Sequence, residues 1–153
     1  MDIEKILPRN EISEEYKWAT EDIYPSDEAF LDDLKCFKKS IAEAEKFNNV
    51  ATTSAKNLLE YYNYYSENLV YIDKLCHYSM LKSDEDKSIS KYQDFNNQTN
   101  SAFNDYVSAI SFFLFYLLRL SDDTLLKYYE EEPDLLFYKK AIDDNRRFAL
   151  HTL

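Results

Sequence analysis

Apolar side chains recur every three or four residues along most of this chain, which is the spacing of one face of an α-helix. The first series predicts a helix from residue 26 to about Phe47. Ser26 offers a hydroxyl for the N-cap, and Asp27 and Glu28 follow where the helix dipole favours negative charge. The apolar stripe of this helix is expected to consist of Phe30, Leu34, Phe37, Ile41 and Ala44.

The same spacing predicts a second helix from about Ala55 to Leu81. Three hydroxyl residues precede it as candidate caps: Thr52, Thr53 and Ser54. Its stripe is expected to contain Leu58, Tyr62, Tyr65, Leu69, Ile72 and Cys76. Tyr61 and Tyr64 widen the apolar face, so this helix is expected to contact two neighbouring helices.

The polar stretch KSDEDKS, residues 82–88, interrupts the pattern before a third helix from about Ile89 to Leu120. The stripe of the third helix is Tyr92, Phe95, Thr99, Phe103, Tyr106, Ile110, Phe113 and Leu117. Its second half is apolar nearly all round, which predicts that this half is the central element of the bundle.

A short fourth helix is predicted after Ser121, and Pro133 stands at a favoured first-turn position for a fifth. Residues 1–25 show no sustained period and are interpreted as an extended arm, whereas residues 26–153 form the helical domain. The chain ends at LHTL without a capping residue, as expected of a segment of a longer polypeptide.

Glycine is absent from all 153 residues, and there are only three prolines. Because sheets and tight turns rely on glycine for positive φ angles, the chain is expected to be all-α. We predict an antiparallel helical bundle of four to five helices, three of them long. A glycine-rich phosphate loop and a dinucleotide fingerprint are both excluded.

The net charge of −11 argues against nucleic acid and anionic membranes as partners, since both require Lys and Arg. It permits a basic partner. The most apolar run, residues 107–120, has 14 residues and is shorter than the ~20 residues of a membrane-spanning helix, so a buried helix is predicted.

Few residues offer catalytic chemistry. His77 has no second histidine four residues away, and neither His77 nor His151 completes a Glu-x-x-His pattern. Cys36 and Cys76 are expected to be reduced thiols in the core, and Cys76 points about 100° away from His77 on a helix. No residue of this chain is therefore predicted to be catalytic or to bind a metal.

Tyrosine is unusually abundant, with 14 residues, and it clusters in LLEYYNYYSENLVY, residues 58–71. The cluster has two interpretations. The tyrosines either replace Leu and Phe along a boundary stripe, or they line a groove for a peptide or another domain.

The segment WATEDIYPSDEAF, residues 18–30, resembles the N-terminal signature of the oligoendopeptidase F family of zinc metallopeptidases. The matching residues are Trp18, Asp22, Ile23, Tyr24, Pro25 and Ser26. Three further segments, residues 78–88, 108–113 and 151–153, resemble the family in the same order. Ala19 and Thr20 depart from the usual residues, and LFYLL lacks the family's Pro-Glu, which would permit a straighter third helix.

The resemblance implies the N-terminal helical part of a longer cytoplasmic enzyme that hydrolyses short peptides. It implies that zinc and its HExxH ligands lie beyond Leu153, in a catalytic domain against which this part packs as a cleft wall that excludes folded proteins. Trp18 and Tyr24 would be buried anchors of the arm, and the substrate-binding residues are unknown. The alternative function is a standalone acidic helical adapter that binds a partner helix or a basic peptide.

Overall fold

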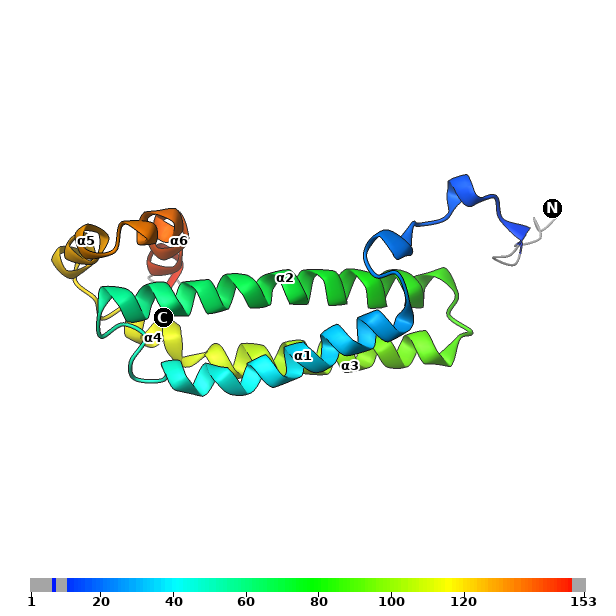
Figure 1. The fold of residues 1–153 in the computed structure, drawn as a ribbon, viewed down its shortest axis with the longest axis horizontal. Helices are drawn as coiled ribbons and strands as arrows, with labels where there is room; N and C mark the ends of the chain where they lie inside the picture. Colours follow the sequence, from blue (N-terminus) through cyan, green and yellow to red (C-terminus); the bar gives the residue numbers. More distant parts are fainter. Residues whose placement is uncertain (1–6, 8–10, 150–153) are drawn as a thin grey trace.

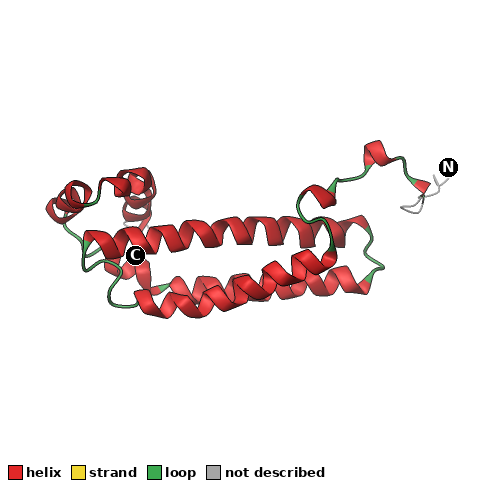
Figure 2. Ribbon diagram, in the orientation of Figure 1, coloured by secondary structure: helices red, strands yellow, loops and turns green. Residues whose placement is uncertain are grey.

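The computed structural model describes residue 7 and residues 11–149, and its main feature is a bundle of three long helices (Figure 1). These are α1 (Asp27–Glu43), α2 (Ala55–Glu85) and α3 (Ser90–Ile110). α2 runs antiparallel to α1 and to α3, which run in the same direction as each other. Helices and loops account for all of the described residues, with no strand among them (Figure 2). The predicted all-α helical bundle is confirmed.

Serine hydroxyls begin three of the helices, as the sequence predicted. Ser26 Oγ accepts a hydrogen bond from the Ala29 N–H at 3.3 Å, and Ser54 Oγ accepts one from the Asn57 N–H at 3.2 Å. Ser121 caps α5 (Asp122–Glu131) in the same way. Each bond satisfies a backbone donor that has no partner within the helix.

The turn between α1 and α2 shows how a chain without glycine reverses direction. A 3₁₀ turn, η4 (Ala44–Phe47), extends α1 to the predicted end of that helix. Asn49 then adopts a φ of 63°. Asparagine tolerates this left-handed conformation better than other non-glycine residues because its short side chain bonds locally.

Two predicted boundaries were wrong by a few residues. α2 continues to Glu85, because KSDE forms its last turn around the buried Ser83, and the chain reverses only between residues 86 and 89. The third helix is interrupted at Ser111, which separates α3 from α4 (Phe112–Leu117) but keeps helical backbone angles. The fifth predicted helix begins as a 3₁₀ turn, η5 (Pro133–Tyr138), and continues as α6 (Lys139–Ala149).

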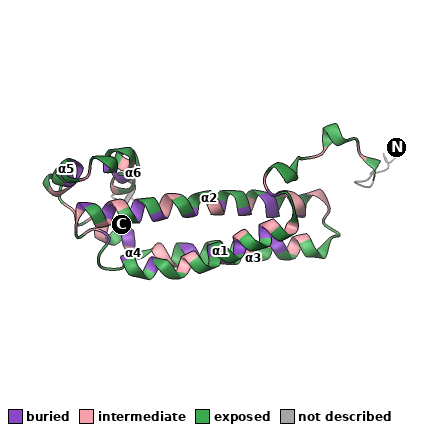
Figure 3. Cartoon of the chain, viewed as in Figure 1, coloured by how far each residue is buried: buried purple, intermediate pink, exposed green. Residues whose placement is uncertain are grey.

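The core lies where α1, α2 and α3 face one another (Figure 3). The fully buried Phe30 ring stacks against Tyr78 of α2 and Phe95 of α3, with centroid distances of 5.2 Å and 4.7 Å. α2 contacts α1, α3, α5 and η5, so it is the central helix. The prediction that the apolar run ending at Leu120 is central was wrong. α4 lies at one end of the bundle, where Phe115 is 54% exposed.

Two residues of the predicted stripes lie outside the core. Leu69 is 42% exposed, while the adjacent Asn68 is buried. Asn68 tolerates burial because Ser40 Oγ donates to its Oδ1 and its own Nδ2 donates to the Tyr64 carbonyl. In α3, Phe103 is exposed and Ala102 takes the inward position, since α1 and α2 both pack on that line.

The arm before α1 forms two short 3₁₀ turns, η2 (Glu14–Tyr16) and η3 (Thr20–Asp22). Tyr24 is buried, and its ring makes edge contacts with Phe30 and Tyr78. The expected burial of Trp18 was wrong, because this side chain is 50% exposed. Only the last part of the arm, from η3 onward, reaches α2, and Trp18 precedes it.

None of the described helices is by itself both long enough and apolar enough to cross a membrane. Only the pair formed by Ser90–Leu117 and Asp122–Glu131, bent by 109°, meets the length and composition criteria together.

Candidate docking surface

Among the described residues, the side chains of His77, Cys36 and Cys76 do not form one cluster. His77 is exposed on α2, with Nδ1 2.7 Å from the Asp73 carbonyl oxygen one turn earlier. Cys76 is half-buried. The expectation that Cys36 lies in the core was wrong, since Cys36 occupies the solvent-facing side of α1. His151 lies outside the described residues.

The described side chains that could bind a metal ion are also dispersed. In residues 11–149, no group of three or more His, Cys, Asp and Glu side chains is arranged to hold a metal ion. The described residues therefore do not fit a zinc site, which needs three or four converging ligands.

The tyrosine cluster of α2 serves mostly as core. Tyr61, Tyr62 and Tyr64 are all buried. The Tyr64 hydroxyl donates to the Ser40 carbonyl of α1 at 3.0 Å, and burial together with the nearby Glu43 carboxylate raises the pKa of Tyr64 to about 12. The Tyr61 ring stacks on Phe113 of α4 with a centroid distance of 3.6 Å. Tyr61 and Tyr64 thus contact two neighbours, as predicted.

One groove remains beside these tyrosines, with a volume of about 270 Å³. The side chains of α2, α3, α4 and α6 line it, and they include Tyr61, Tyr65, Val107, Ile110, Leu114 and Asn145. Tyr65 is partly exposed and lines this groove, so the interpretation of the cluster as a groove for a peptide or another domain stays a prediction.

The groove opens onto a longer apolar surface. Because α2 and α3 are antiparallel, each later turn of α2 lies beside an earlier turn of α3. Partly or fully exposed apolar side chains continue at helical spacing along both helices. We call this surface the α2–α3 face and define it by Leu69, Cys76 and Met80 of α2 with Phe103, Val107 and Leu114 of α3 and α4.

The α3 side of the α2–α3 face carries no charged side chain, whereas on its α2 side the exposed Asp73 lies between Leu69 and Cys76. Between residues 90 and 118, the charged residues are Lys91, Asp94 and Asp105. Their spacing places them on the opposite flank of α3, where Lys91 Nζ lies 2.6 Å from Asp27 of α1. Gln98 of the same flank accepts a hydrogen bond from Lys38 of α1.

Sequence reasoning missed this face because Leu69 and Phe103 were assigned to the core. A signal was nevertheless present in the chain. Residues 95–118 contain one charged residue, Asp105, whereas 31% of the whole chain is charged. An amphipathic helix on a solvated surface should carry more charge than that.

No family model matches the chain. The chain is 28% identical over 145 residues to oligopeptidase PepF of Bacillus subtilis, a match that covers 95% of this chain and 22% of that protein. It is 26% identical to the group B oligopeptidase PepB of Streptococcus agalactiae, covering 85% of this chain and 22% of the relative.

A solved structure agrees with these relatives. The crystal structure of oligoendopeptidase-F from Enterococcus faecium matches with a TM-score of 0.72 and 27% identity. The match covers 79% of this chain and 24% of that one. The chain thus spans less than a quarter of the length of the proteins that it matches. Sequence and fold together confirm the resemblance, and the chain is homologous to a part of the oligoendopeptidase F peptidases.

Proposed function

We propose that this chain is the N-terminal helical domain of an oligoendopeptidase F-like zinc metalloendopeptidase that hydrolyses short peptides in the cytoplasm. The observation that carries this proposal is the asymmetry of the matches, which cover 95% of this chain but 22% of the relative. In this reading residues 1–25 are an arm, residues 26–153 are the helical domain, and the partner is the catalytic domain of the same polypeptide.

The domain has a mechanical role in this proposal. Three helices held by an aromatic core make a stiff wall, since Phe30, Tyr78 and Phe95 join all three. A rigid wall beside a catalytic cleft admits unfolded peptides and excludes folded proteins by size. Zinc supplies the activation of water in such peptidases. The described residues of this chain do not fit the metal, so we assign them no step in the reaction.

The native mass of the protein tests this proposal. An antibody raised against this chain is used to probe an extract of the source organism. We expect a band several times heavier than 18.3 kDa. A single band at 18.3 kDa would overturn the proposal and favour the acidic adapter, which binds a partner helix or a basic peptide.

A second test uses the purified chain. We expect it to bind no stoichiometric zinc and to hydrolyse no peptide. Its control is the B. subtilis relative, assayed with the same peptides. Zinc-dependent turnover that survives repurification of this chain would contradict the assignment of catalysis to another domain.

A further inference from the structure

Three lysines of α1 differ from the other described basic residues in having no counter-charge. In the part of the chain that the structure describes, every other Lys and Arg forms an ion pair with a carboxylate or lies over an aromatic ring. Lys35, Lys38 and Lys39 do neither, and the only partner of their ammonium groups is the Gln98 side-chain oxygen, 3.4 Å from Lys38 Nζ. These three cations are thus unpaired in a protein with a net charge of −11.

The three lysines line one groove between α1 and α3. The volume of this groove is about 350 Å³, and its lining consists of Leu31, Leu34, Lys35, Lys38, Lys39 and Gln98. Lys35 and Lys39 are four residues apart on α1, which corresponds to about 6 Å along the helix axis, and Lys38 lies between them. All three lysines are exposed, so their flexible stems can bring three ammonium groups around the same space.

This arrangement of lysines is unfavourable when no anion is bound. Like charges three or four residues apart on a helix repel each other. The nearest acidic positions on α1 do not relieve the repulsion, because Asp32 forms no ion pair and Glu43 pairs with Lys46 instead. An anion between the three ammonium groups would replace this repulsion with attraction.

The surroundings of the groove favour a compact anion over an acidic peptide. The lysines occupy a single helical turn, whereas carboxylates on alternate residues of an extended peptide are about 7 Å apart. A longer acidic segment would also meet the carboxylates that border the groove, namely Asp32 and Glu43 on α1 and Asp94 beside Gln98 on α3. Lysine binds phosphate as a point charge, and two linked phosphates carry about three negative charges at neutral pH.

We propose that the groove between α1 and α3 binds a diphosphate group through Lys35, Lys38 and Lys39, with Gln98 holding the Lys38 side chain at the groove. Free inorganic diphosphate and a nucleoside diphosphate both present this group. The inference goes beyond the proposed function and does not depend on it, because the groove belongs to this chain by itself.

Isothermal titration calorimetry of the 153-residue chain with inorganic diphosphate tests the proposal, in a buffer free of phosphate and divalent cations. We expect a dissociation constant of about 1 mM or less at low salt. Raising the salt to about 0.15 M should weaken binding by at least about threefold, because ions screen the exposed lysines. Sulfate carries less charge and should bind at least about fivefold more weakly. No binding at about 10 mM diphosphate would overturn the proposal.

Two matched double variants locate the site. Lys35→Gln combined with Lys39→Gln removes two charges from the groove and should weaken diphosphate binding by at least about tenfold. Lys56→Gln combined with Lys127→Gln is the control, because it removes the same charge from lysines that each have a carboxylate partner one turn later. The control should change the affinity by less than about twofold. Equal weakening by both double variants would show a response to net charge alone and contradict a site in the groove. Circular dichroism of both variants checks that the helices are retained.

Two further titrations identify the source of the anion and test the preference for a compact one. ADP presents the same diphosphate group attached to a nucleoside. Either tighter or weaker binding of ADP supports the site if Lys35→Gln with Lys39→Gln abolishes it, and the tighter of ADP and free diphosphate indicates the source. A peptide of six glutamates should bind more weakly than diphosphate. Tighter binding of this peptide would overturn the proposal and assign the groove to an acidic segment.

Discussion

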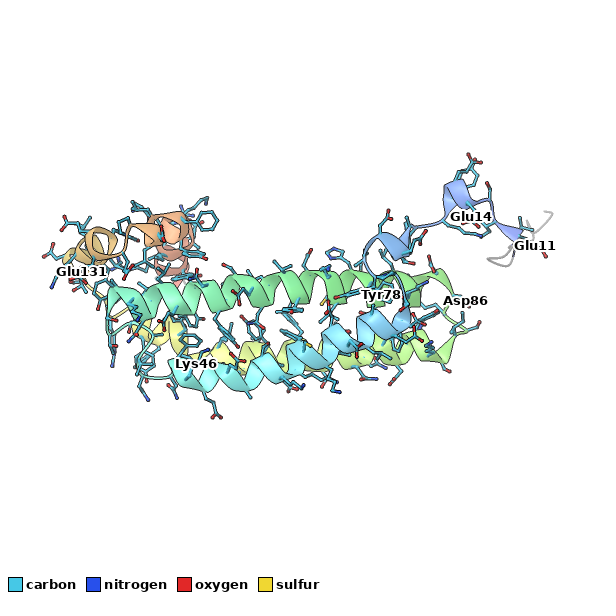
Figure 4. The ribbon with its side chains drawn as sticks, in the orientation of Figure 1. Glu11, Glu14, Lys46, Tyr78, Asp86 and Glu131 are labelled. Atoms are coloured by element: carbon cyan, nitrogen blue, oxygen red, sulfur yellow. The ribbon has the colours of Figure 1, made fainter. Side chains whose placement is uncertain are left out.

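The Tyr78 hydroxyl donates a 2.7 Å hydrogen bond to Oδ1 of Asp27, the first residue of α1. Tyr78 lies near the C-terminal end of α2 (Figure 4). Lys91 of α3 lies 2.6 Å from the other oxygen of the same carboxylate. The three long helices thus meet at one acidic side chain that is 17% exposed. A shared, partly buried carboxylate of this kind links the helices at the end of the bundle where the arm enters.

Removal of the Tyr78 hydroxyl should destabilise the fold. Tyr78→Phe leaves the aromatic packing in place but removes a hydrogen bond to a charged acceptor. We expect the free energy of unfolding to fall by about 2 kcal/mol in urea denaturation. An unchanged midpoint would contradict a structural role for the Tyr78–Asp27 bond.

Tyr106→Phe is the matched substitution with the opposite expectation. The Tyr106 side chain is buried, and its hydroxyl has no hydrogen-bond partner among the described residues. Loss of an unpaired buried hydroxyl removes a desolvation cost, so the free energy of unfolding should be unchanged or rise by up to about 1 kcal/mol. A loss as large as that of Tyr78→Phe would show that the Tyr106 hydroxyl is bonded.

Asp27 should make the protein sensitive to acid. Partial burial by itself raises the pKa of Asp27, but hydrogen bonds from Lys91 and Tyr78 outweigh it and lower that pKa below its usual value. The stabilisation is therefore fully present above the unfolded-state pKa of about 3.9 and is lost as the pH falls through the lower folded-state pKa. Urea denaturation from about pH 6 to about pH 3 should show a smaller acid loss for Asp27→Asn than for the wild type. Parallel pH profiles would refute the assignment.

Tyr24 and Trp18, two of the three aromatic residues of the arm, should differ sharply in their contribution to stability. Tyr24→Ala removes a buried ring that contacts Phe30 and Tyr78, and we expect a loss of about 3 kcal/mol. Trp18→Ala should cost less than about 1 kcal/mol, because half of this side chain is already exposed to water. Chemical denaturation of the two variants in parallel measures both effects. A larger loss for Trp18→Ala would mean that the arm packs through the tryptophan.

The N-cap of α2 should contribute measurably to stability. Ser54→Ala removes the acceptor for the Asn57 N–H, with an expected loss of about 1 kcal/mol. Ser101→Ala, at an exposed position inside α3, is the control and should be neutral or slightly stabilising, because alanine has the higher helix propensity. Equal effects of the two substitutions in thermal unfolding would argue against a capping role for Ser54.

Local features of the sequence predicted most of the helical architecture. Ser26, Ser54 and Ser121 each begin a helix, because capping depends on a side chain and a backbone N–H three residues away. The end of α2 was misplaced because KSDE is polar enough to suggest a loop, yet a helix tolerates polar residues on exposed turns. Boundaries of this kind depend on whether a neighbouring helix still packs against the last turn.

The candidate docking surface was harder to predict than the helices. Apolar periodicity identified the stripe that includes Leu69 and Ile72, but Ile72 is buried and Leu69 is exposed. Periodicity reports that a helix has an apolar side, whereas the packing of α1 and α3 around α2 decides which part of that side is covered. The shortage of charge in residues 95–118 was the available clue.

The sequence by itself determined that this protein is helical, where its three long helices begin, and which family it resembles. Those properties depend on interactions within a few residues, on the absence of glycine, and on a short motif before the first helix. Only the tertiary structure decided that Asn68 and Ala102 face inward while Leu69, Phe103 and Trp18 face water. The physical reason is that burial depends on the position of helices far away in sequence. A polar or small side chain takes the inner position where it finds a hydrogen-bond partner or where helices approach closely.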